Sequence, residues 1–311
     1  MGYTQAHWPQ FRGPNASGVA TGTAPPVEFG PGKNELWRVP MESGHSSPCI
    51  VGESIFLTTY NPTQKTLAVI CLDRSSGATR WQQHVPTDTI EKGHPSFNPA
   101  SSTPTSDGQR VVAYFGSFGL ICFDVDGQTL WEREMPLAKT FGGNAASPII
   151  VGDLVILYRG TYVDHFLLAV DKHTGSEVWQ VEQDEPFSGE MACTACPIVA
   201  GDMLIVHTAR SVQAYDIASG RQIWITKCAT TATSTPVLAG KEVIVAAWNK
   251  MGEPTLRPSF PDFKTLIEKH DKDEDDSISP DELPTVQTLP TPDGAVALNN
   301  GGAIWFVLVR L

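Results

Sequence analysis

The sequence has little positive charge and no long apolar segment. Lys and Arg number 22 against 34 Asp and Glu, which gives a formal net charge of −12. This acidic excess, with no basic cluster, argues against sequence-independent binding to nucleic acid or to an anionic membrane. The apolar run at residues 303–309 is far shorter than the roughly 20 residues of a spanning helix. We therefore expect neither a nucleic-acid partner nor a transmembrane segment.

Export signals and cysteines are also scarce. Residues 1–10 (MGYTQAHWPQ) lack the basic start and the apolar stretch of a signal peptide. The six Cys in 311 residues are too few for a disulfide scaffold, and no two are adjacent. The eight His show no spacing typical of metal ligands. Composition alone therefore assigns no chemistry to the chain.

Two short signatures recur along most of the sequence. The first is a small residue, then Pro, with Gly four residues after the Pro; its Pro residues are Pro48, Pro104, Pro148, Pro197 and Pro236. The second is Asp, a short turn, Gly, and Trp four residues after the Gly; its Trp residues are Trp81, Trp131, Trp179 and Trp224. The signatures alternate, and successive Trp lie 50, 48 and 45 residues apart. A period of about 45 residues is typical of a propeller blade.

Each part of this repeat has a physical reason. β-Branched, alternating runs between the signatures predict strands at residues 53–59, 111–115, 154–158 and 203–207. The Asp carboxylate can accept turn amides, and the Gly closes the turn in a left-handed conformation. The Trp supplies a large apolar surface on which a neighbouring unit can pack. We predict an all-β propeller of four-stranded antiparallel blades, with the four Trp equivalent and packed between blades.

The A-x-D-x-x-T-G-x-x-x-W pattern, clearest at residues 169–179, resembles the pyrroloquinoline-quinone-like (PQQ-like) repeat. This β-propeller family includes quinoprotein dehydrogenases and the propeller lipoprotein of the outer-membrane assembly machine. The opening WPQFRGPN (residues 8–15) and residues 102–120 resemble an exported bacterial subgroup. The resemblance implies a periplasmic or otherwise exported protein that binds a protein partner or a small ligand at a propeller face. It is specific for fold rather than function.

The ring is expected to be incomplete in this chain. Four complete units are present, a fifth begins at Pro236, and a sixth is conceivable around Trp305. Leu36-Trp37-Arg38 resembles a terminal strand without its own Asp turn. In a closed ring this strand would complete a blade begun by the C-terminal part. Unpaired edges are an aggregation hazard, so we suspect a truncated product.

Binding of pyrroloquinoline quinone is not expected. Family dehydrogenases carry a vicinal Cys pair and a catalytic Asp beside a cofactor-bound calcium, whereas this sequence has no adjacent Cys. The Cys193–Cys196 pair has redox or metal spacing. However, Cys196 stands where other repeats have Ser or Thr before Pro, and Cys71 and Cys122 align with Ala169 and Ala214. These cysteines are interpreted as structural.

One segment departs from the β pattern. Residues 261–270 have apolar side chains at Phe263, Leu266 and Ile267, the spacing of a short amphipathic helix. The next twelve residues, 271–282, carry seven acids and one Lys. They match an EF-hand loop, for which we predict a calcium ion held by Asp271, Asp273, Asp275, the Ser277 carbonyl and Glu282. Position 6 of the loop is Asp276 instead of Gly, which would strain a left-handed backbone. The alternative is a solvated acidic linker.

These observations give a provisional organisation. Residues 1–257 are predicted to be propeller repeats, 258–284 an EF-hand-like insertion, and 285–311 a return to propeller strands. We favour a non-catalytic propeller that serves as an interaction or ligand-binding scaffold with a calcium-binding loop. A PQQ-dependent oxidoreductase of the alcohol or sugar dehydrogenase type is the alternative.

Overall fold

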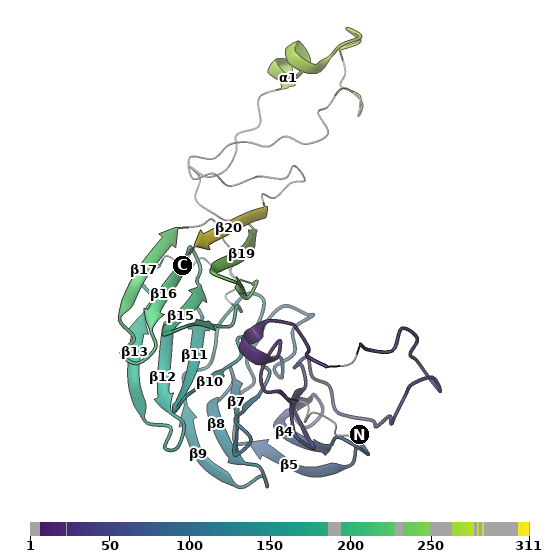
Figure 1. Ribbon diagram of the computed structural model, residues 1–311, viewed down its shortest axis with the longest axis vertical. Helices are drawn as coiled ribbons and strands as arrows, with labels where there is room; N and C mark the ends of the chain where they lie inside the picture. The colour runs from purple at the N-terminus through teal and green to yellow at the C-terminus, as the bar shows by residue number, and fades with distance from the viewer. Residues whose placement is uncertain are drawn as a thin grey trace.

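The computed structural model describes residues 7–22, 24–185, 194–227, 233–248, 263–276, 279, 282 and 304–310. Its strands form five antiparallel sheets that succeed one another along the chain (Figure 1). We call the sheets blades 1 to 5 in chain order. The predicted β-propeller architecture is therefore confirmed. No helix among the described residues is long and apolar enough to cross a membrane.

The first two blades contain nine strands. Blade 1 contains β1 (His7–Trp8), β2 (Cys49–Val51), β3 (Ser54–Asn61), β4 (Thr66–Asp73) and β5 (Thr79–Val85). Blade 2 contains β6 (Thr105–Ser106), β7 (Arg110–Phe115), β8 (Gly119–Asp124) and β9 (Thr129–Glu134).

The later blades follow the same order. Blade 3 contains β10 (Ile149–Val151), β11 (Leu154–Gly160), β12 (His165–Asp171) and β13 (Glu177–Glu182). Blade 4 contains β14 (Ile198–Ala200), β15 (Met203–His207), β16 (Ser211–Asp216) and β17 (Gln222–Lys227). Blade 5 contains β18 (Val237–Ala239), β19 (Glu242–Trp248) and β20 (Ile304–Arg310). Strand β20 pairs with β19, so the idea of a sixth unit at Trp305 is wrong: an insertion separates two strands of blade 5.

The hydrophobic core lies between the blades. One cluster joins Phe56 of blade 1 to Phe123 of blade 2, and another joins Tyr158 of blade 3 to Leu204 of blade 4. Both faces of the middle strands are consequently buried, and β8 and β12 are apolar along nearly their whole length. Each blade therefore depends on its neighbours for burial of its apolar surface.

The repeat tryptophans connect each blade to the next one. The indole Nε1 of Trp81 donates to the carbonyl of Val125 at 2.8 Å, that of Trp131 to Lys172 at 2.9 Å, and that of Trp179 to Ile217 at 3.0 Å. Across its own sheet, each of the four repeat tryptophans faces a small residue, which is Cys71, Cys122, Ala169 or Ala214. The predicted equivalence and inter-blade packing of Trp81, Trp131 and Trp179 are therefore confirmed.

The Asp-to-Gly turns also have the predicted geometry. Asp171 Oδ1 accepts the amides of His173 at 2.8 Å and Thr174 at 2.9 Å. Gly175 follows with a φ of 71°, in the left-handed region. A Cβ there would lie 2.7 Å from the Trp131 ring, so this glycine is required both by the turn and by the tryptophan packed on it.

The small residue before each Pro forms a chain of hydrogen bonds that runs from blade to blade. The amide of Ser47 donates to Thr103 Oγ1 at 2.9 Å, and the amide of Thr103 donates to Ser147 Oγ at 2.9 Å. The chain continues from the Ser147 amide to Cys196 Sγ at 3.3 Å, and from the Cys196 amide to Thr235 Oγ1 at 3.1 Å. This explains why Ser, Thr or Cys, rather than Ala, stands at these positions.

Two N-terminal segments complete the described architecture. Trp37 packs on Gly77 and donates to the Arg74 carbonyl at 2.9 Å, as the repeat tryptophans do in the next blade. Its segment, residues 35–40, pairs with no strand among the described residues. Residues 7–16 form a strap: β1 pairs with β2, the Pro9 carbonyl accepts the Ser106 amide of blade 2, and Asn15 bonds to Val199 of blade 4.

Candidate functional site

The acidic loop begins at the end of the only α-helix among the described residues. Helix α1 spans Phe263–His270, close to the predicted range. Lys269 and His270 occupy its last turn, where positive charge is favourable for the helix dipole. The amide of Asp271 donates to the Ile267 carbonyl at 3.0 Å. The helix therefore fixes the position of the first predicted ligand.

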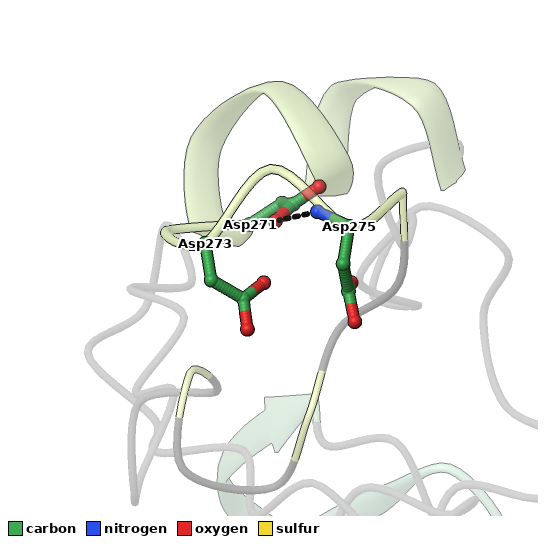
Figure 2. Close-up of side chains that lie close together, drawn as sticks. All are labelled: Asp271, Asp273 and Asp275. Atoms are coloured by element: carbon green, nitrogen blue, oxygen red, sulfur yellow. Dashed lines mark hydrogen bonds between the residues drawn. The ribbon is translucent and has the colours of Figure 1, made fainter.

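Three aspartates of the loop lie close together. One carboxylate oxygen from each of Asp271, Asp273 and Asp275 lies within 4.8 Å of the others. Figure 2 shows the Asp273 and Asp275 carboxylates directed to the same side of the loop, with Asp271 behind them. Two ligands of one Ca²⁺, each about 2.3–2.6 Å from it, are at most about 5.2 Å apart. The aspartate spacing is therefore compatible with a shared calcium ion.

Hydrogen bonds from the loop backbone order Asp271. Its Oδ1 accepts the amide of Asp275 at 3.3 Å, and its Oδ2 accepts the amide of Asp276 at 3.0 Å. The chain turns sharply to bring these amides back, with φ values of 58° at Glu274 and 59° at Asp276. Asp276 thus has the left-handed backbone that position 6 was expected to require, without the glycine that usually provides it.

Glu282 closes the far end of the loop. Its Oε1 accepts the amide of Lys272 at 2.7 Å, and its Oε2 accepts the amide of Ser279 at 2.8 Å and the Ser279 hydroxyl at 2.9 Å. These bonds lower the pKa of Glu282 to about 2. Glu282 therefore stays ionised and joins positions 2 and 9 of the loop.

The loop concentrates negative charge around Asp273. Desolvation and the charges of Asp275, Glu282 and Asp271 raise the pKa of Asp273. The close spacing of the three carboxylate oxygens and the raised pKa of Asp273 both indicate that a cation bound here would relieve the repulsion between the carboxylates. Ser277, the predicted carbonyl ligand, lies outside the described residues. The structure thus brings together Asp271, Asp273 and Asp275, three of the residues chosen from their spacing. It also holds Glu282 against the same loop.

The described cysteines are buried and structural. Cys49, Cys71, Cys122 and Cys196 are all free thiols. Burial raises the pKa of each of them, to about 12 for Cys122. They remain protonated at neutral pH and are poor nucleophiles or metal ligands. Cys193, the other member of the predicted pair, lies outside the described residues.

The contacts that the WPQFRGPN motif makes with blades 1, 2 and 4 were not predicted from the sequence. Asn15 Nδ2 donates to the Val199 carbonyl at 2.7 Å, and Asn15 Oδ1 accepts the Val199 amide at 2.8 Å. The Pro9 carbonyl accepts hydrogen bonds from Cys49 Sγ of β2 at 3.2 Å and from the Ser106 amide of β6 at 2.9 Å, so it joins blades 1 and 2. The Gly13-Pro14-Asn15 turn can be recognised in the sequence, but no local pattern identifies Val199 as the residue that Asn15 bonds to.

Comparisons with known proteins place these features in a family. The family model described as outer membrane protein assembly factor BamB matches residues 28–256. No curated protein shows significant similarity to the chain. Among solved structures, BamB from Moraxella catarrhalis is 18% identical with a TM-score of 0.45, over 65% of this chain and 56% of that one.

Two solved dehydrogenases are similar at the same level. A europium-containing methanol dehydrogenase is 12% identical with a TM-score of 0.45, over 61% of this chain and 44% of that one. The quinohemoprotein alcohol dehydrogenase of Comamonas testosteroni is 14% identical with a TM-score of 0.47, over 64% and 38%. The chain thus spans 38–56% of the length of these three proteins.

Proposed function

Because the chain belongs to the PQQ-like propeller family described as outer membrane protein assembly factor BamB, we propose that it is a non-catalytic scaffold for protein partners. Its blades present surfaces for those partners, and its acidic loop binds calcium. Membership of an assembly-factor family is the observation that carries the scaffold proposal. It also favours an exported, periplasmic location, which cell fractionation can test.

The outer strands of the blades support this proposal. Leu130, Val178 and Ile223 each stand directly before a repeat tryptophan on β9, β13 and β17. Their exposed fractions are 45%, 48% and 42%. Trp131 and Trp179 are fixed by their bonds to the next blade, so Leu130 and Val178 are held on rigid strands. Such ordered, exposed apolar side chains suit recognition of a protein surface.

Photo-crosslinking in cells tests the scaffold. A photoreactive amino acid at Val178 is expected to give a discrete adduct with an envelope protein, and the same probe at the exposed Lys65 turn is expected to give none. The absence of adducts at Leu130, Val178 and Ile223 alike would contradict a role for the outer strands.

The strap favours a scaffold over a quinone enzyme. Residues 7–16 contact β2 of blade 1, β6 of blade 2 and β14 of blade 4, and Figure 1 shows this purple segment on the concave side of the arc of blades. Addition of pyrroloquinoline quinone and calcium to the purified protein is expected to change neither the quinone spectrum nor dye reduction with alcohols or sugars. A stoichiometric complex with dye-reducing activity would instead favour the oxidoreductase.

The calcium proposal depends on the acidic loop. We propose Asp271, Asp273, Asp275, the Ser277 carbonyl and Glu282 as the ligands. The carboxylates fit a hard cation, and Glu282 would have to exchange its bonds to Lys272 and Ser279 for the metal. The ion would neutralise the crowded charge that raises the pKa of Asp273.

Titration calorimetry with matched variants tests this site. Glu282→Gln is expected to weaken calcium binding by about tenfold to a hundredfold, because a hydrogen bond to a charged group is worth ~1.5–3 kcal/mol. Glu274→Gln removes the same charge from a residue that is not a proposed ligand, and it should bind nearly as the unaltered protein does. Equal weakening by both substitutions would indicate a diffuse acidic surface, and no heat at millimolar calcium would indicate a solvated linker.

A further inference from the structure

A carboxylic acid is buried where the connector between blades 1 and 2 meets a turn of blade 2. Glu91 belongs to this connector, residues 86–104, and is only 4% exposed. Its amide donates to Ser117 Oγ at 3.0 Å, and Thr87 Oγ1 donates to the Ser117 carbonyl at 3.0 Å. The connector is therefore attached to the turn between β7 and β8 at Thr87 and at Glu91 itself.

The carboxyl group itself occupies space left by a glycine. A Cβ built on Gly116 would lie 2.4 Å from Glu91 Oε2, so a side chain at this position would displace the acid. Neither oxygen of Glu91 has a hydrogen bond of normal geometry from the described residues. The acid is thus enclosed by backbone, and the nearby amides of Asn144 and Gly116 do not reach its oxygens with regular hydrogen-bond geometry.

The surrounding charges do not compensate for this enclosure. Arg159 is fully buried, and it donates to Tyr114 Oη at 3.0 Å and to the Pro136 carbonyl. Its nearest acid is Asp164, at 3.5 Å, and no described ion pair joins it to Glu91. Burial raises the pKa of Glu91 to about 8, although Arg159 and the amides of Asn144 and Gly116 oppose the rise.

We propose that Glu91 is a proton-controlled latch, which holds residues 86–92 of the connector on the β7–β8 turn while it is protonated and releases them when it ionises. Loss of the proton to solvent leaves a carboxylate that is poorly solvated in the packed position. Arg159 and Tyr114 are the titratable groups that interact with it, and Arg159 is already paired with Asp164 at 3.5 Å. Hydration of the carboxylate then requires the connector to move away from the turn.

Limited proteolysis across pH tests the latch. Lys92, exposed and next to Glu91, reports release, and Lys65, exposed in the turn between β3 and β4, reports the intrinsic activity of trypsin. The ratio of cleavage after Lys92 to cleavage after Lys65 is expected to rise about tenfold from pH 7 to pH 9. This rise follows the ionised fraction of an acid whose pKa is about 8.

Two variants separate the latch from a general effect of pH. Glu91→Gln should give a ratio that does not change with pH, whereas Glu134→Gln, at an exposed acid of β9, should keep the rise. A constant ratio in the unaltered protein would overturn the proposal even if Glu91→Gln did not fold. An equal rise in Glu91→Gln would overturn it as well.

Discussion

Single hydroxyl and thiol groups connect successive blades of this protein. The Oγ1 of Thr103 accepts the Ser47 amide at 2.9 Å, and its own amide donates to Ser147 Oγ at 2.9 Å. The residue thus takes part in two blade junctions. At the next junction Cys196 Sγ accepts in place of a hydroxyl, which gives this buried thiol a structural role.

Removal of the Thr103 hydroxyl should weaken one junction. Thr103→Val keeps the shape but leaves the Ser47 amide without its acceptor, which is expected to cost about 1–3 kcal/mol in the free energy of unfolding. Thr103→Ser keeps the acceptor and should cost less. Urea unfolding of both variants measures the difference, and a valine variant as stable as the serine one would contradict a role for the hydroxyl.

A buried histidine makes the fold sensitive to acid. His207 is fully buried, and burial lowers its pKa to about 4 from an ordinary value of 6.5. Because the folded state resists protonation, stability is intact above pH 6.5 and falls as the pH drops towards 4. The loss is about 3 kcal/mol if the unfolded pKa is ordinary.

Thermal melting between pH 7 and pH 4 measures this loss. His207→Gln should flatten the acid side of the curve, although His165, whose pKa burial also lowers to about 4, keeps part of the slope. His84→Gln changes an exposed histidine on β5 and should leave the slope unaltered. Unchanged pH dependence in His207→Gln would contradict this assignment.

At the scale of the strand and turn, the repeat glycine serves two purposes. Gly175 adopts a left-handed φ of 71°, and a Cβ there would meet Trp131 at 2.7 Å. Gly201 has a similar φ of 63°, but nothing lies within 4 Å of its virtual Cβ. The two positions therefore share a left-handed backbone, which would strain any other residue, but they differ in the packing around them.

This difference predicts unequal effects of alanine. Gly201→Ala should cost about 1–2 kcal/mol, the cost of a left-handed alanine. Gly175→Ala should cost that and a further ~1–3 kcal/mol, because the tryptophan must move. Equal destabilisation in chemical unfolding would mean that the turn alone requires the glycine.

Elements were predictable from sequence where their cause is local. The strand at residues 154–158 and the Asp171–Gly175 turn follow from alternation and turn chemistry within a few residues. The cluster of Asp271, Asp273 and Asp275 in the acidic loop likewise follows from spacing. The Thr103 contact and the fifth-blade pairing of β20 depend on chain segments far away, so no local pattern specifies them.

At the scale of the whole molecule, the blades contact mainly their neighbours, and the strap is an exception. Asn15 bonds to Val199, 184 residues away, while β1 extends blade 1. In a nearest-neighbour array, stability is a sum of local terms and cooperativity is limited. A contact that joins blades 1 and 4 therefore adds coupling between distant parts of the arc.

Asn15→Ala tests that coupling. The variant loses both bonds to Val199, which is expected to destabilise the protein by about 1–3 kcal/mol. If the strap couples the blades, urea unfolding should also broaden, with a lower m-value, because blades 1 and 4 no longer unfold together. Asn34→Ala removes a local bond to the Glu28 carbonyl and, like Asn15→Ala, places alanine at a left-handed φ, so it should cost only about 1–2 kcal/mol and leave the m-value unchanged. A loss of stability at unchanged m-value would show that the strap stabilises blade 4 without coupling it to blade 1.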